Sequence, residues 1–146
     1  MKAFLTILFL ATSLMGSAYA SDYCCPSLNN ISVINGHYCE TYSSNGVQIC
    51  SSQSVPKNAP LPDVFVSANI EVAYNGGRLD CAYGVGNVPV SLNEINGSLS
   101  DNVGPDNSHD TWHSHPGLDR CPAKNAPQDC PFQLSPPRQL SLENVL

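Results

Sequence analysis

Residues 64–92 read VFVSANIEVAYNGGRLDCAYGVGNVPVSL, and this stretch decides the fold. In its first part, apolar side chains occupy every second position: Val64, Val66, Ala68, Ile70, Val72 and Tyr74. Alternation with a period of two is typical of a strand with one buried face. Phe65 breaks the alternation, and we expect it to cover the opposite face. The pattern predicts a strand that turns its even-numbered residues toward the core.

Two turn signals divide the same stretch, Asn75–Gly76 followed by Gly77 and then Gly86–Asn87. Opposite residues of an antiparallel pair share a face, so a two-residue loop at each turn fixes the register. The predicted apolar pairs are Val72–Leu79, Ile70–Cys81 and Ala68–Tyr83, then Val85–Val88, Tyr83–Val90 and Cys81–Leu92. Pro89 then faces Gly84 at a position without hydrogen bonds in the hairpin, which suits an edge strand. The stretch therefore predicts a three-stranded antiparallel meander.

The first twenty residues have the form of a secretory signal peptide. Lys2 supplies the positive start, residues 3–15 are mostly apolar, and Ala18-Tyr19-Ala20 is a small-residue cleavage site. The apolar run is too short to span a bilayer, and no second run follows it. We therefore expect an exported protein, periplasmic or extracellular, without a transmembrane segment.

The charge balance narrows the class of partner. The chain has a net charge of −6, and removing Lys2 with the signal peptide makes it −7. An acidic surface argues against nucleic acid and against anionic membranes. We expect an unidentified protein or glycan partner, bound by one small domain of 126 residues after cleavage.

Seven cysteines remain in the exported chain, at positions 24, 25, 39, 50, 81, 121 and 130. In an exported protein they are read first as disulfides, and the odd number leaves at least one outside an intramolecular bond. A four-residue loop at 43–46 places Cys39 opposite Cys50, within reach of a cross-strand bond. A Cys121–Cys130 bond is expected to pin the carboxyl-terminal region.

Short motifs between Cys24 and Leu92, about half of the chain, resemble DUF3757, a family of small exported bacterial proteins of unknown function. The matching residues are Cys25-Pro26, Ile31, Gly36, Phe65, Ala68, Leu79, Cys81, Tyr83, Val90 and Leu92. The chain departs from the family in Cys24, Cys39 and Cys50, in the lack of a tryptophan in the first half, and in a long carboxyl tail. The resemblance implies a small β domain and a Cys25–Cys81 bond, which leaves Cys24 over. It implies no catalytic residue.

The region after the meander lacks a clear period. Seven of the twelve prolines lie from Pro105 onward, and such a stretch has few backbone donors. We expect an irregular Pro/His/Cys-containing region at 101–146 beside a β domain at 21–100. The predicted fold class is all-β: a small disulfide-stabilised antiparallel sheet or sandwich of four to seven strands.

The segment 106–116, DNSHDTWHSHP, carries the candidate metal ligands. His109, His113 and His115 share parity, so on an extended chain their imidazoles point one way, as ligands for zinc or copper would. Asp106 or Asp110 could complete or orient the ligand shell.

Catalytic motifs are weak. His113-Ser114-His115-Pro116 is similar to the core of JAMM-type zinc isopeptidases, but Lys124 and Pro127 stand where that family has its serine and aspartate. No catalytic residue is assigned. Four tyrosines could form a carbohydrate-stacking face: Tyr38, Tyr42, Tyr74 and Tyr83. We expect Tyr74 and Tyr83, however, to lie in the core. The sequence favours a non-enzymatic binding or structural module without a cofactor. The alternative is a zinc- or copper-binding protein.

Overall fold

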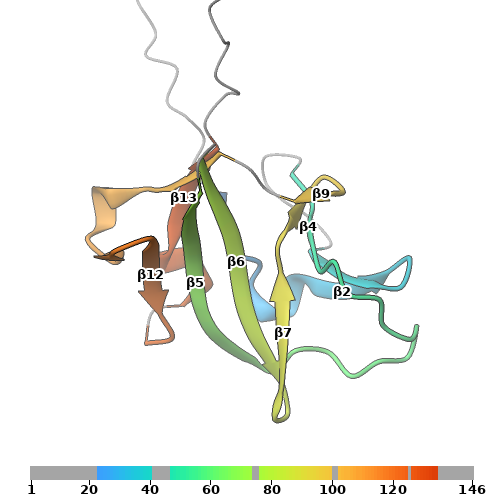
Figure 1. Cartoon of the computed structure of the whole chain (residues 1–146). Coiled ribbons are helices and arrows are strands. Elements are labelled where there is room, and N and C mark those ends of the chain that lie inside the picture. The colour runs from blue at the N-terminus through green and yellow to red at the C-terminus, as the bar shows by residue number, and fades with distance from the viewer. Residues whose placement is uncertain (1–22, 41–46, 74–75, 100–101, 125, 135–146) are drawn as a thin grey trace, which may run out of the picture.

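The computed structural model describes residues 23–40, 47–73, 76–99, 102–124 and 126–134 (Figure 1). In these residues the chain forms thirteen strands, three short 3₁₀ helices and no α-helix. The strands are β1 (Tyr23–Cys24), β2 (Ile31–Ile34), β3 (His37–Glu40), β4 (Ile49–Cys50), β5 (Val64–Ala73), β6 (Gly76–Val85), β7 (Val88–Leu92), β8 (Glu94–Ile95), β9 (Ser98–Leu99), β10 (Val103–Pro105), β11 (His113–His115), β12 (Leu118–Pro122) and β13 (Pro131–Leu134). The 3₁₀ helices are η1 (Leu28–Asn30), η2 (Asn107–His109) and η3 (Pro127–Asp129). The predicted signal peptide at 1–20 lies outside the described residues.

The strands form two antiparallel sheets. The main sheet has eight strands in the order β1-β13-β10-β6-β5-β12-β11, with β7 paired to β6, and the second has five in the order β2-β3-β4-β8-β9. The chain passes between the two sheets several times, and one of these crossings is where β7 continues into β8. At this bend the backbone N–H of Asn93 donates to the carbonyl of Cys50 over 3.0 Å. In Figure 1, β2 runs across the direction of β5, β6 and β7. The all-β, antiparallel fold class is confirmed.

One apolar core joins the two sheets. It takes side chains from the second sheet, from the meander and from the carboxyl-terminal strands, so the described part of the chain shares a single core. Its largest members are Ile31, Tyr38, Ile49, Phe65, Ile70, Leu79, Tyr83, Val90, Leu92, Trp112 and Phe132.

The meander is present, with one of its two registers as predicted. The pairs Val85–Val88, Tyr83–Val90 and Cys81–Leu92 are all found. In the first hairpin, however, Ile70 faces Leu79 and Ala68 faces Cys81, a shift of two residues from the predicted pairing. The shift keeps the parity, so these four residues stay on the predicted core face. The turn residues 74–75 lie outside the described part of the chain.

A β-bulge at Val66 corrects the predicted core face of β5. The register shifts between Phe65 and Ser67, so the side chains before the bulge change sides. Phe65 is 8 % exposed and packs edge-to-face on Tyr83, with 5.5 Å between ring centroids. Val64, at 50 %, and Val66, at 38 %, point to solvent. Val72 is 62 % exposed at the far end of β5, so the prediction that these three valines face the core was wrong.

Because of the bulge, two neighbouring residues of β5 should differ in how much they contribute to stability. Phe65→Ala is expected to destabilise the protein by about 3–5 kcal/mol, because it removes a buried aromatic ring. Val66→Ala is expected to change the free energy of unfolding by about 0.5 kcal/mol or less, because its side chain is partly in solvent. Urea unfolding followed by circular dichroism measures both. Equal losses would contradict the bulge.

The carboxyl-terminal region is more regular than the sequence predicted. β12 pairs with β5 over five residues, and β10 joins β6 to β13. The strands are too short to show a period, and three prolines sit at their ends, where a missing donor is tolerated. These prolines are Pro105, Pro122 and Pro131. The strands β10, β11, β12 and β13 therefore belong to the same sheet as the meander.

Three disulfides link the chain: Cys25–Cys81, Cys39–Cys50 and Cys121–Cys130. They match the three expected pairings, and Cys24 lies outside them. Such a framework is typical of proteins that mature in an oxidising compartment.

Candidate functional site

The face of the main sheet that points away from the core carries polar side chains across four neighbouring strands. On this face His113 of β11 lies opposite Arg120 of β12, Arg120 lies opposite Asn69 of β5, and Asn69 lies opposite Asp80 of β6. Opposite residues share a face. The Oγ of Ser91 on β7 donates to Oδ1 of Asp80 over 2.5 Å and extends the set to a fifth strand. We call these five residues the polar row.

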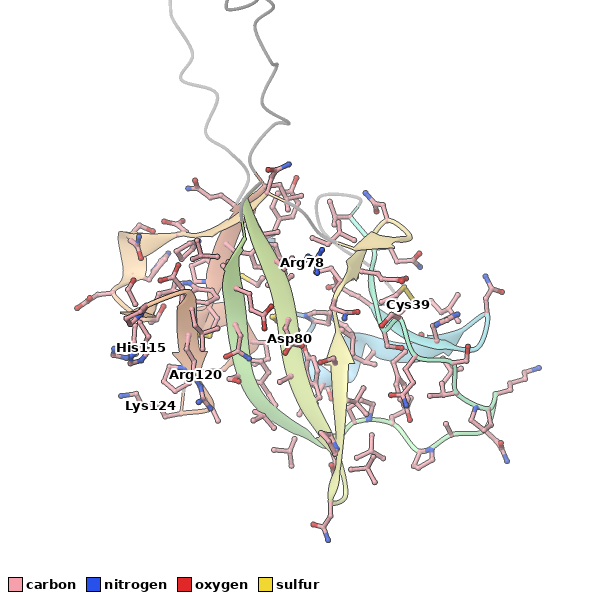
Figure 2. The ribbon with its side chains drawn as sticks, in the orientation of Figure 1. Cys39, Arg78, Asp80, His115, Arg120 and Lys124 are labelled. Atoms are coloured by element: carbon pink, nitrogen blue, oxygen red, sulfur yellow. A yellow bond between two sulfur atoms is a disulfide. The ribbon has the colours of Figure 1, made fainter. Side chains whose placement is uncertain are left out.

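A second row lies beside it on the same face. His115 lies opposite Leu118, Leu118 opposite Glu71, and Glu71 opposite Arg78. The facing carboxylate and guanidinium of the last pair favour this register. Figure 2 shows His115 and Arg120 on the side of β12 and β11, with Arg78 and Asp80 on β6 across β5.

The alternation of apolar and polar residues in the meander explains why some of its residues belong to the polar row and to the row beside it. Ala68, Ile70, Leu79 and Cys81 are buried, so the residues between them point outward. The polar outward positions of the meander are visible in the sequence. What sequence reasoning missed is that β11 and β12 extend this face, because the β12–β5 pairing joins segments about fifty residues apart, and no local pattern reports it.

The structure brings together two of the three predicted metal ligands. His113 and His115 share the outer face of β11 and are exposed, whereas His109 lies in η2. Asp106 caps η2, with its Oδ1 accepting from the N–H of Ser108 over 2.9 Å. In the described part of the chain no group of three or more His, Cys, Asp or Glu side chains could hold a metal ion.

Two of the four candidate stacking tyrosines lie in the core. Tyr38 and Tyr83 are buried, and their hydroxyls donate to the carbonyls of Pro60 and Pro26 over 2.6 and 2.5 Å. Tyr83 is thus a core residue, as predicted. Tyr42 and Tyr74 lie outside the described residues.

One carboxylate sits at the junction of the two sheets. Glu40, on β3 opposite Ile31, is half-buried, and this burial raises its pKa from 4.5 to about 7. Burial, and after it the charge of Glu40, raises the pKa of Tyr83. Ionised Glu40 is therefore unfavourable in the folded protein.

This shift gives a pH dependence with a definite sign. The folded-state pKa of Glu40 lies above its ordinary value, so its contribution to stability is fully present below pH 4.5 and is lost as the pH rises through about 7. Glu40→Gln should raise the melting temperature at pH 8 and leave it nearly unchanged at pH 4.5. Glu71→Gln, which removes an exposed carboxylate opposite Arg78, should show no such gain. Equal melting temperatures of Glu40→Gln and the natural protein at pH 8 would refute this assignment.

No family model, curated protein or solved structure matches the chain. The resemblance to DUF3757 therefore stays a prediction. None of the helices in the described residues is long and apolar enough to cross a membrane.

Proposed function

We propose that the chain is an exported, non-enzymatic binding module that holds a glycan across the polar row. The polar row itself carries the proposal: Arg120 offers donors, Asp80 offers acceptors, and Asn69 offers both. These groups lie on neighbouring strands of a rigid, disulfide-linked sheet, so they are positioned before a ligand arrives. A sugar ring presents hydroxyls that both donate and accept hydrogen bonds, and this chemistry matches the row.

The spacing of the row favours a glycan over a peptide. Neighbouring strands lie about 4.8 Å apart, close to the length of one pyranose ring, so a sugar chain running across the strands meets one polar side chain per ring. The side chains on one face of an extended peptide repeat at about 6.7 Å, which does not match this spacing. Nucleic acid is disfavoured because Asp80 and Glu71 would meet its phosphates, on a chain of net charge −6.

A glycan array tests the proposal. The exported protein is applied at pH 7 to neutral and acidic oligosaccharides, beside the double variant Asn69→Ala/Arg120→Ala. The control is Asn29→Ala/Lys57→Ala, which removes the same kinds of side chain from exposed positions outside the row. We expect the natural protein and the control to bind a shared set of glycans. The row variant should bind them at least about tenfold more weakly, because it loses one or two hydrogen bonds to the ligand. Equal binding by all three proteins, or binding by none, would reject the proposal.

Zinc or copper binding by His109, His113 and His115 is the alternative. Metal analysis of protein purified without a histidine tag tests it, with stoichiometric metal that is lost in His113→Ala/His115→Ala as the supporting result.

A further inference from the structure

We propose that the glycan is acidic and that its carboxylate binds at Arg120, beside His113 and His115. This inference rests on the proposed function, because it names the class of glycan that the same face binds.

The cationic groups gather at one end of the polar face. His113 lies directly opposite Arg120, and His115 follows two residues later on the same side of β11. All three side chains are exposed, as is that of Lys124 just beyond β12. Figure 2 shows His115, Arg120 and Lys124 at the same end of the molecule. We call these four residues the cationic end.

The cationic end suits an anion better than a metal ion. A metal ion at the imidazoles of His113 and His115 would meet the permanent charge of Arg120, whose guanidinium offers donors and no acceptor. The neighbouring carboxylate of Asp119 has the parity of Ile70, on the other side of the sheet, and accepts from Oγ of Ser114 over 2.6 Å. A carboxylate, by contrast, can accept from the guanidinium of Arg120 and from imidazole N–H groups together.

The nearest carboxylate on this face lies outside the cationic end. In the described residues β11 pairs only with β12, which turns Leu118 and Arg120 outward. The nearest outward carboxylate is that of Glu71, which lies across Leu118 from His115 and faces Arg78. His109 and Asp110 are exposed at η2, outside β11.

The acidic residues farther along the face limit the number of anionic groups. Glu71 and Asp80 stand one or two strands from the cationic end and would repel a ligand with an anion at every position. Asn69 and Ser91, with the acceptors of Asp80, instead fit hydroxyls. The expected ligand is therefore a glycan that carries a uronic acid at one end and neutral sugars beyond it.

Isothermal titration calorimetry at pH 7 tests this inference. The probes are neutral tetrasaccharides capped with one glucuronate or galacturonate, and the matched controls are their uncharged methyl esters. We expect the acid to bind about five- to tenfold more tightly than its ester. Arg120→Gln should no longer prefer the acid, and His113→Ala/His115→Ala should prefer it less strongly than the natural protein does.

Each of the following outcomes would overturn part of the inference. Equal affinity for acid and ester would overturn the inference but leave glycan binding standing. An unchanged preference for the acid in His113→Ala/His115→Ala would overturn the role of the histidines. Equally tight binding of an acidic peptide, tetraglutamate, would overturn the glycan class. Binding of no probe in either form would overturn the inference, and the glycan array decides separately whether glycan binding itself fails. Thermal melting of each variant checks that the fold is retained, as expected for exposed positions.

Discussion

Gly77→Ala is expected to lower the free energy of unfolding by more than about 3 kcal/mol. Gly77 is buried on β6 between Val72 of β5 and Val103 of β10. A Cβ at this position would overlap with the carbonyl oxygen of Val103 and with Cγ2 of Ile70. Neither can withdraw easily, because one is strand backbone and the other belongs to a fully packed core residue. The methyl group would push β10 away and separate β6 from β13.

Gly84→Ala is the matched control on the same strand. A Cβ there would meet the carbonyl oxygen of Gly86 at 3.5 Å and Cβ of Val64 at 3.8 Å, which are ordinary contacts. We expect a change of about 1 kcal/mol or less, because the added methyl group fits and alanine restricts the unfolded chain. Urea unfolding followed by circular dichroism compares the two. A loss below 1 kcal/mol for Gly77→Ala would show that β10 does not pack against β6 as described.

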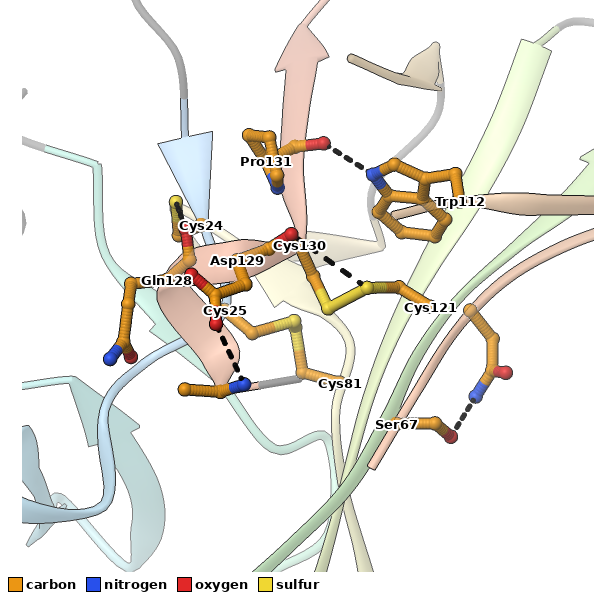
Figure 3. The surroundings of a disulfide bond; sticks show 12 residues. Cys24, Cys25, Ser67, Cys81, Trp112, Cys121, Gln128, Asp129, Cys130 and Pro131 are labelled. Carbon is orange, nitrogen blue, oxygen red and sulfur yellow. Dashed lines mark hydrogen bonds between the residues drawn. A yellow bond between two sulfur atoms is a disulfide. The ribbon is translucent and has the colours of Figure 1, made fainter. Parts of the chain in front are cut away.

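Removing the Cys25–Cys81 disulfide is the second large effect. The bond joins residues 56 apart, and the chain-entropy estimate for such a loop is about 4 kcal/mol. Cys81 is on the middle strand of the meander and is fully buried, so the bond fastens the start of the described chain onto the core. Figure 3 shows it beside the Cys121–Cys130 bond. Since a small domain is stabilised by only about 5–15 kcal/mol in total, the loss is a large fraction.

The test uses Cys25→Ala/Cys81→Ala, which leaves no new thiol in the core. Its melting temperature should fall by well over ten degrees, whereas Cys24→Ser should stay within a few degrees of the natural protein. The Cys39–Cys50 and Cys121–Cys130 bonds close shorter loops, with separations of 11 and 9, and each should contribute about 3 kcal/mol. Peptide mapping without reduction checks the pairing. A Cys24–Cys81 peptide, or an equal loss in Cys24→Ser, would contradict the framework.

The meander shows which features of the fold the sequence predicts and which it does not. Alternation alone predicted the buried residues of β6 and β7, because their side chains follow a period of two; these are Leu79, Cys81, Tyr83, Val90 and Leu92. It failed at Val88, which is 61 % exposed at the turn between the two strands. It failed at Val64 and Val66, because a bulge adds one residue without leaving a local signal beyond the misplaced Phe65. The first-hairpin register was two residues off, because Asn75, Gly76 and Gly77 offer several turns of the same parity.

The candidate site was less accessible from sequence. The site residues that lie in the meander, such as Asn69 and Asp80, follow from the same alternation as the core residues. The histidines of β11 were singled out as metal ligands, but the sequence could not place Arg120 opposite His113 or β12 beside β5. Those contacts depend on long-range pairing, which the structure supplies and which changes the expected ligand from a cation to an anion.

Nuclear magnetic resonance titration tests the central claim, that a glycan binds along the polar row, most directly. Uronate-capped tetrasaccharide is added to ¹⁵N-labelled exported protein at pH 5.5, and the backbone amide shifts are followed. The largest changes should fall on β11, β12, β5 and β6, at His113, Arg120, Asn69 and Asp80, while β2 and β3 of the second sheet stay unchanged. Changes centred on the second sheet, or no saturable change at millimolar ligand, would contradict it.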